Sequence, residues 1–135
     1  MIFLINKPIH LTSAQVVSKI KKTFQLKKVG HCGTLDPLAT GMLPICVGEG
    51  TKFSQYILSK NKKYRVGIKL GIKTDTYDVT GTILEKNRYN HISYNHIKNT
   101  LYSFIGKSKQ SPPPYSAIKV KGKCAYKLAR KGIYL

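Results

Sequence analysis

Acidic residues are scarce in this sequence. Its 135 residues include only 5 Asp plus Glu, against 24 Lys plus Arg, so the formal net charge is +19. Around a folded domain this excess creates a positive field, and the commonest partner of such a field is a polyphosphate. A genome with a biased nucleotide composition produces the same excess, so the charge indicates a nucleic-acid partner without specifying one.

Cysteine and long apolar runs are also rare. Three scattered cysteines argue against a disulfide scaffold and a Cys-x-x-Cys metal site, and they favour a reducing compartment. The apolar start, Met-Ile-Phe-Leu-Ile, is too short for a signal peptide, and no run approaches the ~20 residues of a membrane span. We therefore expect a cytoplasmic chain with no membrane partner and no metal.

The order of apolar and polar residues predicts one α+β domain. Thr12 and Gln15 have the spacing of a capping box, which predicts a helix that runs to about residue 25. Ser93 is expected to cap a second helix, which stops at Gly106. The other expected elements are a buried strand at 2–6, a helix at 51–58 with Phe53, Tyr56 and Ile57 inward, strands at 64–70 and 82–85, an irregular strand at 116–123, and a short helix at 124–130.

Asp36 differs from the other four acids, which are expected in solvated positions or turns. It lies in an uncharged, glycine-rich loop with the sequence Gly-His-Cys-Gly-Thr-Leu-Asp-Pro-Leu-Ala-Thr-Gly (residues 30–41), and lysines flank that loop. One interpretation is a carboxylate that caps its own turn before Pro37. The other is a nucleophile or general base that positive charge keeps ionised at a polyanion site. The loop by itself leaves both open.

The loop is part of a longer motif, and three further blocks accompany it. Residues 29–53 read Val-Gly-His-Cys-Gly-Thr-Leu-Asp-Pro-Leu-Ala-Thr-Gly-Met-Leu-Pro-Ile-Cys-Val-Gly-Glu-Gly-Thr-Lys-Phe. The other blocks are Asn-Lys-Pro with Thr-Ser at 6–13, Lys-Tyr-Arg with Thr-Asp-Thr-x-Asp and Gly at 63–81, and Pro-x-Tyr-Ser-Ala-x-Lys-x-x-Gly-Lys from 113. In this order they resemble the bacterial tRNA pseudouridine-55 synthases, the TruB family.

The resemblance implies a pseudouridine synthase fold, with a mixed, mostly antiparallel sheet flanked by helices. It implies cofactor-free isomerisation of uridine to pseudouridine at position 55, in the T loop of tRNA. Asp36 matches the family's catalytic aspartate, which attacks either C1′ of the ribose or C6 of the base. Tyr64 matches the tyrosine that stacks on the flipped uracil and assists proton removal from C5. His31 matches the histidine that takes the place of the extruded base. The remaining expected RNA-binding residues are Lys7, Gly33, Thr34, Lys52, Arg65 and Lys119.

The sequence also departs from the family pattern. His10 stands where the family has the glycine of Lys-Pro-x-Gly. Residues 1–135 contain no counterpart of the family's Gly-Thr-Tyr-Ile-Arg block, whose arginine pairs with the catalytic aspartate. We expect these residues to be the N-terminal part of the catalytic domain, without the C-terminal RNA-binding domain, acting as a monomer on the T arm.

Two other classes of function remain open. A catalytically weak or inactive remnant that binds or folds tRNA is the main alternative. A basic structural protein of a ribonucleoprotein would explain the charge but not the Asp36 loop.

Overall fold

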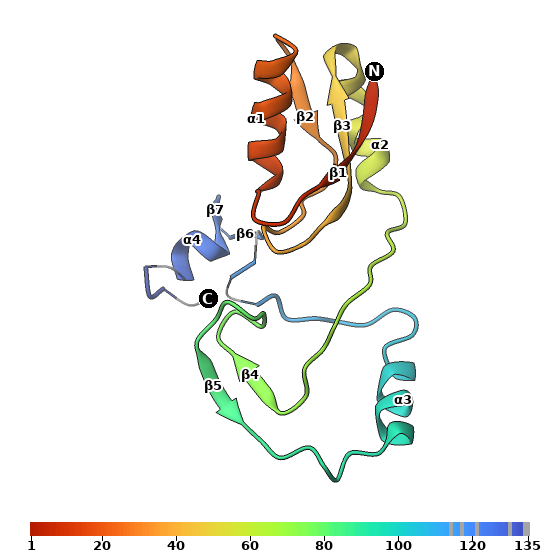
Figure 1. Ribbon diagram of the computed structural model, residues 1–135, viewed down its shortest axis with the longest axis vertical. Helices are drawn as coiled ribbons and strands as arrows, with labels where there is room; N and C mark the ends of the chain where they lie inside the picture. The colour runs from red at the N-terminus through yellow and green to blue at the C-terminus, as the bar shows by residue number, and fades with distance from the viewer. Residues whose placement is uncertain (114, 117, 121, 130, 134–135) are drawn as a thin grey trace. The chain divides into compact units, whose positions relative to one another are not determined.

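The structure is a computed structural model, and it describes residues 1–113, 115, 116, 118–120, 122–129 and 131–133. The chain divides into two units, Met1–Arg65 and Val66–Leu135. The first unit contains β1 (Ile2–Lys7), α1 (Ser13–Thr23), β2 (Val29–His31), β3 (Gly41–Val47), a 3-10 helix η1 (Gly48–Phe53) and α2 (Ser54–Leu58), all labelled in Figure 1 except η1.

Helix α1 begins and ends with local hydrogen bonds that its sequence encodes. Thr12 is the N-cap: its side chain accepts from the Gln15 backbone N–H, and the Gln15 side chain accepts from the Thr12 N–H, which completes the predicted capping box. At the other end Gln25 has a φ of 51°. There the N–H groups of Gln25 and Leu26 donate to the carbonyls of Lys22 and Lys21. This is the Schellman pattern, and it stops the helix close to the predicted residue 25.

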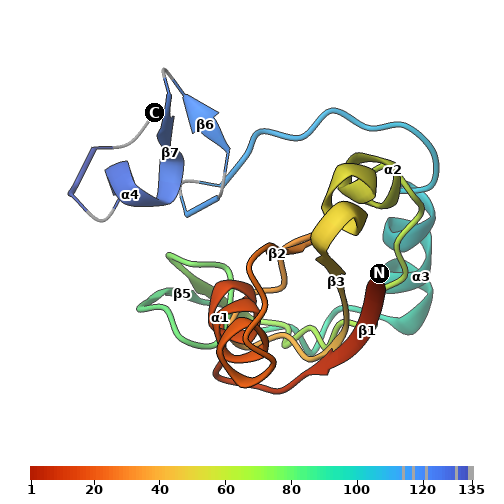
Figure 2. The same ribbon diagram turned by 90° about the horizontal axis from the view of Figure 1, so that it is seen from above.

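The first unit is built around a three-stranded antiparallel sheet with the strand order β1-β3-β2. Helix α1 lies along this sheet beside β2 in both views (Figures 1 and 2). Val16 of α1 packs against Leu43 and Ile45 of the central strand, and these three buried side chains form the core cluster. The sheet and α1 together hold the connection between β2 and β3, which contains Asp36.

Proline lies inside the central strand, because Pro44 is the fourth residue of β3. A proline within a sheet removes one ladder hydrogen bond. In a strand the N and the C=O of one residue point to the same neighbour, and the Pro44 carbonyl accepts from the Cys32 N–H at 2.8 Å. The absent N–H therefore faces the side of β2, beyond its last paired residue, His31, so the ladder with β1 stays complete.

The second unit consists of hairpins and short helices. Its elements are β4 (Ile72–Thr74), β5 (Ile83–Lys86), α3 (Tyr94–Tyr102), β6 (Lys119–Val120), β7 (Lys123–Cys124) and α4 (Ala125–Ala129). β4 pairs with β5, and β6 pairs with β7, in both cases antiparallel. Ser93 caps α3 by accepting from the His96 N–H, as the sequence predicts. The α+β class and the antiparallel pairing expected from the sequence are confirmed.

Several local expectations are wrong. Residues 64–70 alternate in polarity but form no strand, and Val66 and Ile68 are exposed. No strand was expected in residues 29–50, because their sequence has no clear period, but they contain β2 and β3. The strand expected to be buried at 2–6 forms as β1, but it is largely exposed, with Leu4 66% accessible. Phe53 and Tyr56, expected to point inward, are exposed.

The predicted strand at 116–123 is in fact the hairpin of β6 and β7, and Ala117 and Lys121 lie outside the described residues. No helix formed by the described part of the chain is long and apolar enough to cross a membrane.

Candidate active site

Two glycines with positive φ delimit the loop that carries Asp36. Gly33 (φ 120°) begins the loop after β2, and Gly41 (φ 119°) is the first residue of β3. Side chains strain these backbone conformations, so glycine is required where the chain turns into and out of the loop. The Asp36 and Thr34 side chains between them are exposed.

The Asp36 backbone lies in a tight turn. The Ala39 N–H donates to the Asp36 carbonyl at 3.0 Å, and Pro37 occupies the second position of this turn, where its fixed φ is favoured. No hydrogen bond or ion pair of the Asp36 carboxylate occurs among the described residues. The turn interpretation therefore applies to the backbone, whereas the carboxylate does not cap its own turn and stays open to solvent.

The residue before Asp36 is held by a buried serine of α1. The Ser13 hydroxyl donates to the Leu35 carbonyl at 3.1 Å and accepts from the Leu35 N–H at 2.9 Å. Sequence reasoning did not select Ser13. Its signals were its place directly after a helix N-cap and within the Thr-Ser pair of the first block, but its partner lies 22 residues further along the chain.

The residue after Asp36 is held by β1 and the segment that follows it. The Pro37 carbonyl accepts from the His10 N–H at 2.7 Å and from the Lys7 ammonium at 3.4 Å. Lys7 is 0% exposed, and its Nζ also donates to the carbonyls of Pro8 and Leu11. The ammonium group of Lys7 is therefore directed into the protein and holds the loop, which argues against the predicted contact of Lys7 with RNA.

His31 also bonds to the loop backbone. Its Nδ1 lies 2.6 Å from the Gly33 carbonyl oxygen. A carbonyl can only accept, so Nδ1 carries the proton, and in the neutral ring Nε2 is the acceptor. The half-buried ring thus has a fixed orientation at the start of the loop.

The remaining predicted site residues lie outside the Asp36 loop. Tyr64 and Arg65 are exposed in an irregular segment at the end of the first unit, and no hydrogen bond or ion pair among the described residues joins them to the loop. Lys52 in η1 forms an exposed ion pair with Glu49, which contributes little stability. Lys119 belongs to β6 in the second unit.

Two buried cysteines lie beside the loop in the sequence: Cys32 directly follows β2, and Cys46 belongs to β3. The Cys32 and Cys46 sulfur atoms are 2.9 Å apart and form a hydrogen bond. Burial, together with this hydrogen bond, raises the pKa of the Cys32 thiol to about 11, so the thiol form dominates at neutral pH. No cluster of three or more His, Cys, Asp or Glu side chains in the described residues is suited to a metal ion.

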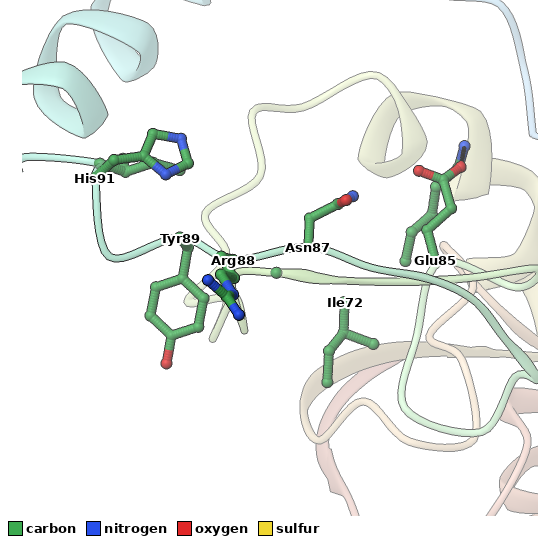
Figure 3. Close-up of a pocket in the computed structure, with 9 residues that line it drawn as sticks. Ile72, Glu85, Asn87, Arg88, Tyr89 and His91 are labelled. Carbon is green, nitrogen blue, oxygen red and sulfur yellow. Dashed lines mark hydrogen bonds and ion pairs between the residues drawn. The ribbon is translucent and has the colours of Figure 1, made fainter.

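A separate pocket of about 570 Å³ lies in the second unit, beside β4 and β5. Figure 3 shows Arg88 and Tyr89 projecting to one side of the chain and Asn87 to the other. None of the predicted site residues lines this pocket. The Asp36 loop is therefore the stronger candidate site.

Comparison with known proteins identifies the family to which this loop belongs. The model of the TruB family pseudouridylate synthase (N terminal domain) matches residues 21–135. The chain belongs to the TruB family. The matched region includes Asp36 and Tyr64, whereas Lys7 and Ser13 lie before it.

Curated relatives of this TruB-family chain are named tRNA pseudouridine synthase B. The protein from Alkaliphilus oremlandii is 52% identical over 129 residues, which is 96% of this chain and 43% of the relative. The protein from Blochmanniella pennsylvanica is 48% identical over 98% of this chain and 51% of the relative, and that from Yersinia pestis is 48% identical over 98% and 40%. The chain thus spans about half the length of these relatives, or somewhat less.

One solved chain is also similar. It belongs to the structure of an H/ACA RNP bound to a substrate RNA containing 2′-deoxyuridine, and it is 42% identical over 41% of this chain and 17% of its own length, with a TM-score of 0.40. This TM-score is too low to support an argument about the fold.

Proposed function

We propose that this chain is the N-terminal part of a catalytic domain that isomerises uridine to pseudouridine at position 55 in the T loop of tRNA. The observation that carries the proposal is the exposed carboxylate of Asp36 on a backbone held at residues 35, 36 and 37. Residues 35–37 lie inside the region that matches the family, whereas Ser13, Lys7 and His10, which hold residues 35 and 37, precede it. A nucleophile needs both an accessible oxygen and a fixed direction of approach.

The proposed reaction needs no cofactor, because its atoms balance within the nucleotide. Asp36 attacks the flipped uridine at C1′ or at C6. By either route the N1–C1′ bond breaks, the base rotates, and a C5–C1′ bond forms. On the C1′ route the carboxylate leaves C1′ as the C5–C1′ bond forms, and on the C6 route it leaves C6 after that bond has formed. A proton leaves C5, N1 gains one, and the carboxylate is regenerated unchanged.

Tyr64 is the proposed partner of the flipped base. Its side chain is 67% exposed, so a face of the ring is available for stacking. Stacking of a base on an aromatic ring is worth roughly 1–3 kcal/mol, which offsets much of the few kcal/mol needed to extrude the base. The tyrosine also assists proton removal from C5, and His31 fills the space that the base leaves in the T loop.

The proposed partner is the T arm of a cytoplasmic tRNA, bound by a monomer. The charge of +19 supports phosphate contacts, which position an RNA without reading its sequence. Exposed lysines such as Lys27, Lys28 and Lys52 are available for this purpose. Each phosphate contact adds roughly 0.7 to 0.9 to the slope of log affinity against log salt, so binding of a T-arm stem-loop should weaken steeply with salt.

Substitution of Asp36 tests the proposal directly. Asp36→Asn keeps the volume of the side chain but removes the nucleophilic oxygen, so pseudouridine formation should disappear while T-arm binding remains. Tritium release from a tRNA labelled at C5 of uridine measures the reaction, and a filter-binding assay measures affinity. Glu49→Gln is the matched control, because it neutralises another exposed carboxylate of the same unit.

Two results would contradict the proposal. Conversion by Asp36→Asn at the wild-type rate would exclude Asp36 as the nucleophile. A wild-type chain that binds the stem-loop but converts none of it in a single-turnover reaction would favour the tRNA-binding remnant instead.

A further inference from the structure

A single buried hydroxyl group connects the start of α1 to the loop that carries Asp36. Ser13 is the first residue of α1 and is 2% exposed. Its oxygen accepts from the Leu35 N–H at 2.9 Å and donates to the Leu35 carbonyl at 3.1 Å. Within the described chain no other hydrogen bond reaches the Leu35 backbone.

These two bonds fix the peptide groups on both sides of Leu35. The Leu35 carbonyl belongs to the peptide that joins Leu35 to Asp36, so its direction sets where the Asp36 N and Cα lie. The Leu35 side chain packs against the core cluster, which anchors the residue but leaves rotation of its peptide groups possible. The Ser13 hydroxyl removes that remaining freedom.

The position of Ser13 distinguishes it from a helix cap. Thr12 supplies the cap of α1, and the Ser13 hydroxyl directs both of its hydrogen bonds away from the helix. Burying a hydroxyl is costly unless it is hydrogen-bonded, and here the loop supplies both partners. Because α1 packs on the central strand, the hydroxyl belongs to one of the rigid parts of the unit, as support of a reactive group requires.

We propose that Ser13 is a positioning residue for the nucleophile, and that it acts on Asp36 through the Leu35 backbone. This inference rests on the proposed function of Asp36. A misplacement of a reacting group by 1 Å can reduce a rate by about 100-fold. Loss of the hydroxyl should therefore slow the chemical step and leave RNA affinity unchanged, because Ser13 is buried and cannot touch RNA.

The test compares Ser13→Ala with two other variants of the full chain. Ser13→Thr keeps the hydroxyl and is the conservative rescue. Thr12→Ala is the matched control, because it removes a hydroxyl from the adjacent residue and weakens the same helix by loss of its cap, but it does not touch Leu35. Two quantities are measured well below the unfolding temperature: the single-turnover rate with a saturating T-arm stem-loop, and hydrogen exchange of the Leu35 amide by NMR.

We expect Ser13→Ala to lower the rate by about 100-fold at unchanged RNA affinity and to speed Leu35 exchange by about tenfold or more. Ser13→Thr should recover most of the rate, and Thr12→Ala should change neither quantity appreciably. Equal rates for Ser13→Ala and the wild type, or unchanged Leu35 exchange, would overturn the proposal, since packing of the Leu35 side chain would then suffice. Equal losses in Thr12→Ala would overturn it too, because the effect would be one of helix stability.

Failure of the proposed function gives a different result. In that case the wild-type chain forms no pseudouridine, whatever residue stands at position 13. Leu35 exchange then decides alone whether Ser13 holds the loop.

Discussion

Replacement of Lys7 by methionine should destabilise the first unit without weakening RNA binding. The ammonium group of Lys7 lies 2.9 Å from the Pro8 carbonyl, 2.6 Å from the Leu11 carbonyl and 3.4 Å from the Pro37 carbonyl. Methionine has nearly the same length and shape but no donor. The change therefore tests the three hydrogen bonds with little change in packing.

The expected cost follows from which carbonyls lose a partner. The Pro37 carbonyl keeps its hydrogen bond from the His10 N–H, whereas Lys7→Met removes the donor to Pro8 and Leu11. A buried polar group left without its partner costs about 1–3 kcal/mol, but Leu11 is half-buried and Pro8 is exposed, so water replaces part of the lost bonding. We expect a net loss of about 2 kcal/mol. For a chain of this size that is a decrease in Tm of about 7 °C.

Urea unfolding followed by circular dichroism measures this loss as a lower midpoint at an unchanged slope. Lys27→Met is the control, because it removes an exposed lysine from the same unit and should change stability by no more than about 0.5 kcal/mol. The salt dependence of T-arm binding supplies the second readout. Lys7→Met should leave the slope of log affinity against log salt unchanged, whereas loss of a lysine that contacts phosphate lowers that slope by roughly 0.7 to 0.9.

Either of two results would refute this reasoning. A loss of stability below about 1 kcal/mol would mean that water or a rearranged backbone replaces the ammonium group. A reduced salt slope would show that Lys7 reaches phosphate after all.

Two further predictions concern ionisable side chains. Because burial raises the pKa of Cys32 to about 11 and Cys46 is also buried, brief treatment with iodoacetamide at pH 8 should label Cys124 alone; mass spectrometry would count the labels, and two or more on the native chain would contradict the expectation. In the turn between β4 and β5, hydrogen bonds from Thr80 and Thr76 lower the pKa of Asp78 below its ordinary 3.8. The lowered pKa stabilises the folded hairpin above pH 3.8, and this stabilisation is lost as the pH falls through the lower pKa of the folded state. Asp78→Asn should therefore make the stability of the hairpin less dependent on pH between pH 2 and 5, as measured by NMR. The same pH dependence in the variant and the wild type would contradict the expectation.

Features that depend on neighbouring residues could be predicted from the sequence. The caps of α1 and α3 are examples, because Thr12 bonds to Gln15 and Ser93 to His96, each three residues away. The end of α1 is similar, since the Leu26 N–H reaches back only to Lys21. Such contacts leave a signature in a short window of sequence.

Strands were predicted less well, because a strand exists only with a partner. Residues 64–70 alternate as a strand should, but no other segment of the described chain pairs with them. β3 was missed for the opposite reason: it contains Pro44 and shows no alternation, yet it is paired on both sides. Alternation of polar and apolar residues indicates which side chains of a strand would be buried. Whether the segment pairs depends on another part of the chain.

In the candidate site, too, local features could be predicted from the sequence and contacts between distant segments could not. Its motif singled out Asp36 in the sequence, but the motif does not say what holds that residue in place. Lys7 and Ser13 act on partners 30 and 22 residues away. Both bonds depend on how β1 and α1 pack beside the loop, which no local pattern encodes.

The hydrogen bonds that fix the Asp36 backbone also bear on when the loop acquires its shape. All of them join residues between Lys7 and Ala39, and the strands and helix that carry them end at Val47. Chains are synthesised from the N-terminus, and early segments fold first. During translation, the whole segment that fixes the geometry around Asp36 therefore leaves the ribosome before Tyr64, the proposed partner of the flipped base.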